Sequence, residues 1–297
     1  MSKTSTAFFS GKVILTGEHS VVFGHLALLA SLDLGVRASV SAGELSLEQR
    51  SDAYLQHLLQ LAARVLGRKD LAVAIKIDST LPVKSGLGSS AALAAALLQA
   101  VMNFFGRELT KAELYQLVLE AENFIHGSSS GADPAIVVYG GLLAFQGGES
   151  TPLQAAILTE QKFFLINSGA ASESTGEMVT LVKNNPKAPA TIAKIAELSL
   201  KMHEDLQKGR WQPQLFDQNQ ALLEELGVVG EAAKKIIVKL QAIGAHCKIT
   251  GAGGVAAGSG YILATHSDSH FLSNQLQVQG LDFFGASLGE SKGGQNA

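Results

Sequence analysis

A short loop rich in glycine and serine, which runs straight into a long apolar stretch, most constrains the fold. Its sequence over residues 81–92 is Leu-Pro-Val-Lys-Ser-Gly-Leu-Gly-Ser-Ser-Ala-Ala, and the alanines and leucines that follow are strong helix formers. Because Gly86 and Gly88 have no side chains, a phosphate can approach the backbone closely. The loop ends at a predicted helix N-terminus, where unpaired N–H groups and the helix dipole favour an anion. The predicted phosphate-binding residues are Lys84, Ser85, Gly86, Leu87, Gly88, Ser89, Ser90 and Ala91.

The same loop also fits a plain strand-to-helix turn in which a serine caps the helix and no ligand binds. It departs from the P-loop pattern G-x-x-x-x-G-K-[ST], because Ser89 rather than a lysine follows Gly88. If the loop holds a triphosphate, positive charge has to come from elsewhere in the chain. The hydroxyls of Ser89 and Ser90 would suit a phosphate oxygen or a Mg²⁺ ion.

Length and composition narrow the classes of function. The chain has 297 residues, of which 46% are hydrophobic, and this predicts a large core and two domains. A net charge of −3 offers no basic field for nucleic acid or an anionic membrane, so small-molecule chemistry is favoured. The single cysteine, together with an N-terminus that lacks a signal-peptide pattern, predicts a cytoplasmic protein. The most apolar segment, residues 91–105, is too short to span a membrane.

Hydrophobic periodicity predicts strands early in the chain and helices later. Short alternating runs within residues 7–48 predict an antiparallel meander with tight turns, and residues 72–77 predict a strand that leads into the glycine loop. Helical patterns cover residues 54–66, 91–105, 110–126, 176–183, 190–208, 214–226, 231–243 and 268–278. Further strand-like runs cover residues 162–166, 261–265 and 281–284.

Three side chains outside the loop could carry chemistry. Glu122 lies on the apolar stripe of the predicted helix 110–126, and a buried carboxylate is costly unless a cation or several donors meet it. Asp133 precedes Pro134, which also fits an N-cap followed by proline at the first helical position. Lys12 taken alone could be an ordinary surface lysine. With the glycine loops, these residues form the set expected of a phosphoryl transferase.

Four segments resemble the motifs of the GHMP family of small-molecule kinases. Residues 11–24, Gly-Lys-Val-Ile-Leu-Thr-Gly-Glu-His-Ser-Val-Val-Phe-Gly, are similar to the first motif, and residues 82–92 to the second. Residues 126–134 are similar to the segment that carries the catalytic aspartate, and residues 248–254 to the third motif. The four segments follow the family's order along nearly the whole chain.

Two details resemble the mevalonate-kinase branch of this family. The first motif continues with apolar residues 21–23, whereas galactokinases usually have a polar and acidic continuation there. Homoserine kinases usually lack an aspartate at the position of Asp133. The resemblance therefore implies ATP-dependent phosphorylation of the primary hydroxyl of mevalonate. Two alternatives stay open: a related kinase for phosphomevalonate, homoserine or a sugar, and a nucleotide-binding protein without transfer activity.

The resemblance also implies an α+β, two-domain GHMP kinase fold. Residues 1–152 would form a nucleotide-binding and catalytic domain with a mixed sheet and helices. Residues 153–297 would form a second domain with a ferredoxin-like sheet and helices, which closes over the substrate; glycine, serine and proline cluster at the boundary. ATP, Mg²⁺ and a homodimer are implied as well.

The roles of individual residues follow from the same resemblance. Asp133 would accept or orient the proton of the acceptor hydroxyl, and Lys12 would lie between Asp133 and the γ-phosphate. Ser90 and Glu122 would ligate Mg²⁺. The residues expected to contact the acceptor are Glu18, His19, Gly131, Thr175, Gly251 and Ala252.

The chain departs from the family in two places. Its third glycine loop reads Gly-Ala-Gly-Gly-Val-Ala-Ala at residues 251–257, where family members commonly continue with further glycines. Residues 173–175 are Glu-Ser-Thr, where mevalonate kinases often have a basic residue before a threonine. Either Glu173 faces away from the acceptor, or the acceptor differs from mevalonate.

Overall fold

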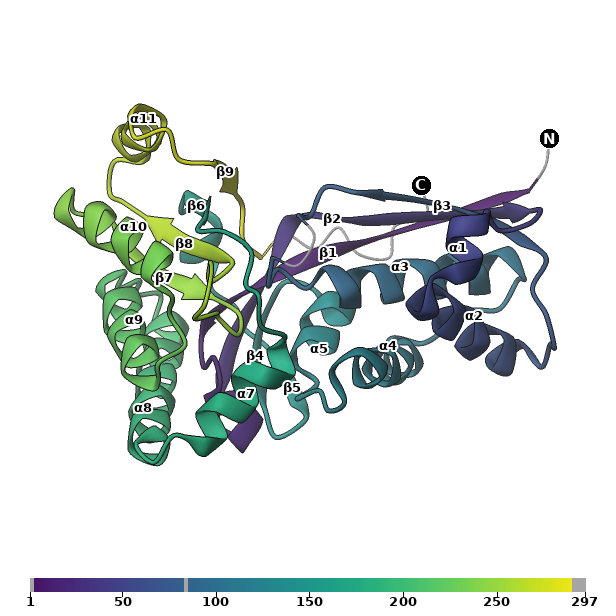
Figure 1. Ribbon diagram of the computed structural model, residues 1–297, viewed down its shortest axis with the longest axis horizontal. Coiled ribbons are helices and arrows are strands. Elements are labelled where there is room, and N and C mark those ends of the chain that lie inside the picture. Colours follow the sequence, from purple (N-terminus) through teal and green to yellow (C-terminus); the bar gives the residue numbers. More distant parts are fainter. Residues whose placement is uncertain (1–2, 83–84, 290–297) are drawn as a thin grey trace.

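The computed structural model describes residues 3–82 and 85–289 and has two parts, each built on a sheet covered by helices (Figure 1). The first part contains β1 (Thr4–Thr16), the 3₁₀-helix η1 (Ser20–Phe23), β2 (Ala27–Ala42), α1 (Leu47–Ser51), α2 (Ala53–Leu66), β3 (Val73–Ser79), α3 (Ser89–Phe104), α4 (Lys111–His126), α5 (Ala132–Tyr139), β4 (Leu142–Gln146) and β5 (Glu149–Pro152). The second part contains α6 (Ala156–Thr159), β6 (Phe163–Asn167), α7 (Thr175–Asn184), α8 (Ala188–Gln207), α9 (Gln214–Leu226), α10 (Glu231–Ala242), β7 (His246–Thr250), β8 (Tyr261–Thr265), α11 (Ser269–Val278) and β9 (Phe283–Ala286).

The first sheet has the order β1-β2-β4-β5, with β3 also paired to β2. The expected mixed sheet is wrong, because all the ladders between its described strands are antiparallel. The physical reason is the length of β2. Its first residues pair with β4 and its later residues pair with β3, so two strands share one edge of β2 end to end and no parallel pairing is needed.

The early strands are longer than their hydrophobic runs indicate. The runs within residues 7–15 merge into β1, and those within residues 26–41 merge into β2. The predicted meander also ends earlier than residue 48: Ser46 caps α1, where its side chain accepts from the backbone of Gln49 and the Gln49 side chain accepts in return. This capping box begins a helix where a strand was expected.

The phosphate-loop helix α3 forms the centre of the first part. It contacts β1 and β2 on one side and the helices α2, α4 and α5 on the other, and most of its residues are buried. Helix α4 begins after a capping box between Thr110 and Glu113, as the sequence predicts. A helix that is apolar all round has to lie between layers, and α3 therefore presents its N-terminus at a fixed place beneath the sheet.

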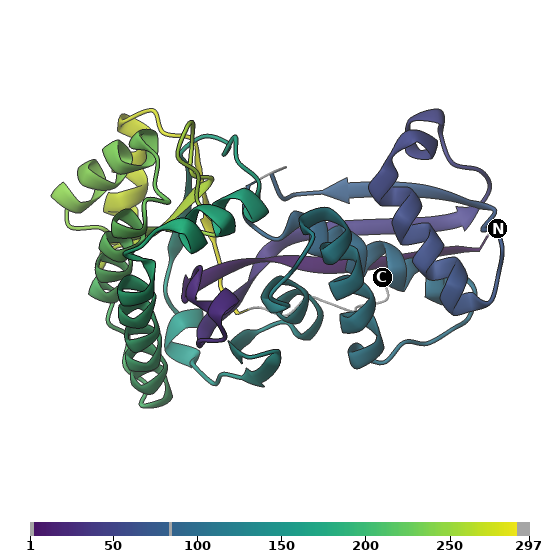
Figure 2. The ribbon, with the colours of Figure 1, turned by 60° about the horizontal axis from the view of Figure 1, so that its bottom comes forward.

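The second sheet is antiparallel and has the order β7-β8-β6-β9. Helices α9 and α10 pack against β7, and α8 packs against α9 and the first part of the molecule. This agrees with the second domain that the resemblance implies. Figure 2 shows α8 and α9 at the outer end of this part, while the segment after β9 runs back to the first sheet, where Leu288 pairs with Leu32. No helix among residues 3–82 and 85–289 is long and apolar enough to cross a membrane.

Candidate active site

The phosphate loop, residues 81–92, and the third glycine loop, residues 251–257, meet where the two parts of the molecule join. A Cβ on Gly86 of the second loop would lie 3.2 Å from the carbonyl oxygen of Thr250, and a Cβ on Gly251 would lie 3.2 Å from the carbonyl oxygen of Gly86. The first motif joins the same junction, since the backbone N–H of Ile14 donates to Thr250 Oγ1 at 2.9 Å. Two glycines therefore allow a backbone-to-backbone approach that side chains would prevent.

Lys12 is aimed into this junction by the local structure of β1. The pairing register shifts between Ser10 and Lys12, and such a bulge re-aims the side chain that follows it. The backbone N–H of Lys12 donates to the Leu87 carbonyl at 2.9 Å. Its side chain then crosses Gly88, where a Cβ would lie only 2.8 Å from Lys12 Cγ. Gly88, which also has a φ of +75°, is thus needed as much by the lysine as by a phosphate.

The amine of Lys12 lies 3.1 Å from Asp133 Oδ1, and these side chains are 3% and 32% exposed. We call them the reacting pair because of the role that we propose for them. Helix α5 begins at Ala132 with Gly131 as its N-cap, so Asp133 lies inside the first turn, and the simple interpretation of Asp133 as an N-cap is wrong. Gly131 has a φ of +86°, and a Cβ there would lie 2.6 Å from the hydroxyl of Tyr115. The tight turn therefore leaves the carboxylate free to face Lys12.

Glu122 offers a buried oxygen that fits a cation. Its side chain is 3% exposed, Oε2 lies 3.5 Å from His126 Nε2, and Oε1 has no hydrogen-bond partner among the described residues. The hydrogen bond with Glu122 raises the pKa of His126. Tyr54 donates to the Ser90 carbonyl at 3.2 Å, and burial, together with the nearby Glu122, raises the pKa of Tyr54. Glu122 and Ser90 therefore share a neighbour in Tyr54.

No group of three or more His, Cys, Asp or Glu residues within residues 3–82 and 85–289 could hold a metal ion by itself. One carboxylate and one hydroxyl, completed by water and phosphate oxygens, nevertheless suit Mg²⁺, which rarely uses an all-protein cage. The unpartnered carboxylate oxygen of Glu122 and the donor chemistry of Ser90 are thus compatible with the predicted magnesium site.

His19 is held in one protonation state. It is 5% exposed, and its Nε2 lies 3.0 Å from the carbonyl oxygen of Ala252. Because a carbonyl only accepts, Nε2 carries the hydrogen and Nδ1 presents a lone pair; Nδ1 has no partner among the residues that the structure describes. Burial lowers the pKa of His19 to about 4, so the ring is neutral near pH 7. His19 therefore keeps an unused hydrogen-bond acceptor at its buried Nδ1.

Glu18 does not face an open cleft, although the resemblance implies that it contacts the acceptor. Its carboxylate accepts from Lys248 Nζ, and from Asn219 Nδ2 at 2.9 Å. Lys248 Nζ also donates to the carbonyls of Ile14 at 3.0 Å and Ile249 at 2.8 Å. Both side chains of this buried pair, Glu18–Lys248, are 0% exposed. Burial lowers the pKa of the Lys248 amine, and the Glu18 carboxylate opposes that shift.

The sequence interpretation missed Lys248 and Asn219 as parts of this network. A lysine inside the apolar strand β7 and an asparagine on the buried face of α9 were the available signals. Neither reveals its partner, because Glu18 is far away in the sequence.

The predicted phosphate-loop residues differ in their burial and in their partners. Ser85 Oγ donates to the Pro82 carbonyl at 2.8 Å and accepts from the backbone N–H of Leu87 at 3.4 Å, so it shapes the loop. Leu87 and Ala91 are fully buried in the core. Ser89 and Ser90, at the start of α3, are partly exposed. Lys84 lies outside the described residues.

Two residues that the sequence analysis singled out, Glu173 and Thr175, lie just before α7 and at its first position. Thr175 is the exposed first residue of α7, and a Cβ on Gly176 would lie 3.5 Å from the His126 carbonyl. This places the start of α7 beside the end of α4. Glu173 turns to the third glycine loop, where its carboxylate accepts from the N–H of Ala256 at 2.8 Å and of Val255 at 3.3 Å. Glu173 therefore has its own partners and no longer indicates a different acceptor.

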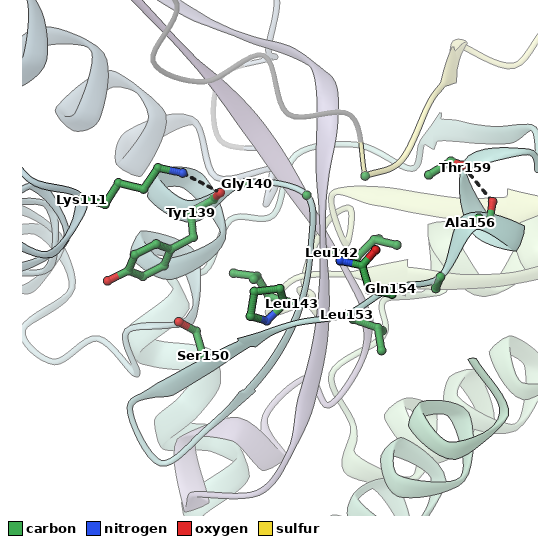
Figure 3. Close-up of a pocket in the computed structure, with 14 residues that line it drawn as sticks. Lys111, Tyr139, Gly140, Leu142, Leu143, Ser150, Leu153, Gln154, Ala156 and Thr159 are labelled. Atoms are coloured by element: carbon green, nitrogen blue, oxygen red, sulfur yellow. Dashed lines mark hydrogen bonds between the residues drawn. The ribbon is translucent and has the colours of Figure 1, made fainter. Parts of the chain in front are cut away.

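A cavity of about 700 Å³ lies away from this junction, at the other end of α5 (Figure 3). Most of its lining residues lie between Tyr139 and Thr159, in the end of α5, in β4, β5 and α6, and in the segments that join them. Its one charged lining residue, Lys111, donates to the Tyr139 carbonyl at 3.3 Å. None of the predicted site residues lines it, so it is not the candidate active site.

A comparison with known protein families identifies the class of this chain. The GHMP kinases N terminal domain matches residues 53–141, a span that contains the phosphate loop, Glu122 and Asp133. The class that the fold and site define is therefore that of the GHMP kinases.

Relatives narrow the class to one family. The mevalonate kinase of Archaeoglobus fulgidus is 33% identical over 82% of this chain and 87% of its own length. That of Thermococcus sibiricus is 32% identical over 91% of each chain. The chain belongs to the mevalonate kinase family. The crystal structure of Methanococcus jannaschii mevalonate kinase has the same fold, with a TM-score of 0.81 at 20% identity over 97% of this chain and 98% of that one.

Proposed function

We propose that this protein transfers the γ-phosphoryl group of ATP to the primary hydroxyl of mevalonate, giving 5-phosphomevalonate and ADP. The observation that carries the proposal is the reacting pair, Lys12 and Asp133, at 3.1 Å beside the phosphate loop. The relatives that match most of the chain are named mevalonate kinases, which supports mevalonate as the acceptor.

Asp133 is the residue that receives the acceptor hydroxyl in this proposal. Its carboxylate is partly exposed and can accept a hydrogen bond while it stays 3.1 Å from Lys12. Phosphoryl transfer passes through a loose transition state, so the proton leaves late and orientation of the hydroxyl matters as much as its removal. Lys12 places positive charge where negative charge spreads over the transferring group.

The N-terminus of α3 and the glycines before it would hold the phosphates through backbone N–H groups. Ser90 and Glu122 would hold Mg²⁺, which, when bound, neutralises charge on the β- and γ-phosphates. The unpartnered Glu122 Oε1 supports this assignment.

The other end of the acceptor would meet His19, which can accept a hydrogen bond from a hydroxyl of the acceptor at Nδ1. Gly131, Thr175, Gly251 and Ala252 remain proposed walls of this region. We reassign Glu18 from contacting the acceptor to holding the turn that carries His19, because its carboxylate is fully buried and paired.

A coupled assay of ADP release with mevalonate, phosphomevalonate, homoserine and galactose tests the proposal. We expect turnover with mevalonate and with none of the other three acceptors. Absence of turnover at millimolar mevalonate would overturn the proposal, and turnover with phosphomevalonate instead would identify the related kinase. Binding of ATP without turnover of any acceptor would favour the non-catalytic alternative. The homodimer and the cytoplasmic location stay predictions. Analytical ultracentrifugation at micromolar concentration tests whether the protein is a homodimer.

A further inference from the structure

A single carboxylate joins the loop before α7 to the third glycine loop. Glu173 accepts from the adjacent backbone N–H groups of Val255 and Ala256, and from Ser172 Oγ at 3.1 Å. These bonds, led by the one from Ala256, lower the pKa of Glu173. Hydrogen bonds to a charged acceptor are shorter and stronger than neutral ones, and successive amides form a natural anion site. The protein therefore fills this anion site with its own side chain.

The two loops are packed against each other on the inner side of this contact. The N–H of Gly258 donates to the Ala170 carbonyl at 3.2 Å, and a Cβ on Gly254 would lie 2.7 Å from the Cβ of Ala171. Residues 255–257, by contrast, are exposed. The carbonyls of this tip lie against Gly230, where a Cβ would be 2.8 Å from the Ala257 oxygen. Glu173 thus adds a polar contact that joins the solvent-facing side of the tip to the segment before α7.

Both loops lead to the acceptor side of the proposed site. Ala252, which precedes the Glu173 contact by three residues, accepts the hydrogen bond from His19. On the other loop, Thr175 begins α7 two residues after Glu173, and α7 begins beside the end of α4. The carboxylate therefore links the segment that orients His19 to the segment that carries Thr175.

We propose that Glu173 is a positioning residue for the acceptor site. It holds the third glycine loop in a fixed position relative to the start of α7, so that Ala252 orients His19. This inference rests on the proposed function, because it concerns the acceptor side of that site. The loop amides satisfy both oxygens of the Glu173 carboxylate, so this side chain organises the protein itself.

The test compares Glu173→Ala and Glu173→Gln with a matched control, Glu177→Gln. Glu177 lies in the same segment and accepts from the Ser174 N–H at 2.7 Å, a bond that the oxygen of glutamine can retain. The readouts are the KM values for mevalonate and ATP and the hydrogen exchange of the Val255 and Ala256 amides.

For Glu173→Ala we expect the mevalonate KM to rise about tenfold and the two amides to exchange about tenfold faster, as for the loss of one or two hydrogen bonds. The ATP KM should stay within about twofold, because the hydrogen bonds of Glu173 go to Ser172, Val255 and Ala256 and not to the described residues of the phosphate loop. Glu173→Gln should lie between Glu173→Ala and the wild type, since its amide oxygen can accept one of the two bonds. Glu177→Gln should behave as the wild type.

An unchanged mevalonate KM in Glu173→Ala, or an equal rise in Glu177→Gln, would overturn the positioning role. Unchanged exchange at both amides would overturn the contact on which that role rests. The exchange measurement needs no substrate. Failure of the proposed function would instead appear as a wild-type protein that does not phosphorylate mevalonate, whatever the exchange result.

Discussion

Two lysine–carboxylate pairs each have one member near the start of the chain, and they differ in what remains available to a ligand. The reacting pair, Lys12–Asp133, leaves the aspartate about one-third exposed. The buried pair, Glu18–Lys248, is inaccessible, and its lysine also donates to two backbone carbonyls while its glutamate accepts from Asn219. Both pairs join the β1 region to distant elements, yet only one has capacity left for chemistry.

We infer from the comparison that, at this junction, a buried group with unused hydrogen-bonding capacity is a candidate to act on a ligand, whereas a group whose hydrogen bonds are all made within the protein supports the fold. Glu122 illustrates the point. It is as buried as Glu18, but one of its oxygens lacks a partner among the described residues. By this criterion Glu122 belongs with the reacting pair.

The largest expected effect comes from Asp133→Asn. Asparagine preserves the shape but cannot accept the proton, and we expect kcat to fall about 10³-fold while nucleotide affinity is retained. ADP release and nucleotide titration measure the two effects. An unchanged rate would mean that another group receives the acceptor hydroxyl, and the distinction between the two pairs would fail.

Matched lysine substitutions test the comparison directly. Lys248→Met leaves the buried Glu18 carboxylate without its cationic partner. It should lower the free energy of unfolding, measured in urea, by about 3 kcal/mol. Lys12→Met leaves an aspartate that water can reach, so it should reduce kcat far more than stability. Equal losses of stability in the two variants would contradict this division. The double variant Glu18→Gln/Lys248→Met should recover part of the stability lost in Lys248→Met.

Glu122→Gln tests whether an unpartnered buried oxygen marks a metal ligand. We expect the Mg²⁺ concentration for half-maximal activity to rise about 20-fold, since a neutral amide binds a hard cation weakly. Glu120→Gln is the control: it lies on the same helix, and its carboxylate pairs with Arg64 at the surface. An equal Mg²⁺ requirement in both variants would remove Glu122 from the metal site.

His19→Asn tests, through the pH dependence of stability, whether a buried group with one unpartnered nitrogen stays neutral in the folded protein. Its folded pKa of about 4 lies below the unfolded value of 6.5, so the unfolded chain binds the proton first as the pH falls. His19 therefore lowers stability between pH 6.5 and 4 by up to about 1.4 kcal/mol per pH unit.

Urea unfolding at pH 4, 5, 6 and 7 measures this slope. Asparagine does not titrate and tolerates the positive φ of position 19, so the variant should lose less stability on acidification. Parallel curves for the two proteins would contradict the neutral, buried state of His19.

Much of the local structure was predictable. The capping box at Thr110 and Glu113 marks the start of α4, and residues 261–265 form the predicted strand β8. The joining of Lys12 and Asp133 was predicted through the family resemblance. The pairing of β2 along one edge with two successive strands was not predicted, because register depends on partners that no single segment specifies.

The sequence alone determined the approximate bounds of most of the helices and the chemistry that each loop could offer. These depend on periodicity, capping and glycine, which act over a few neighbouring residues. Only the tertiary structure decided which charged groups retain capacity for a ligand: Lys248 saturates Glu18, and Glu173 turns to the third loop. Long-range contacts make these choices, since the energy of a charge depends on the groups and the water that surround it once the chain has folded.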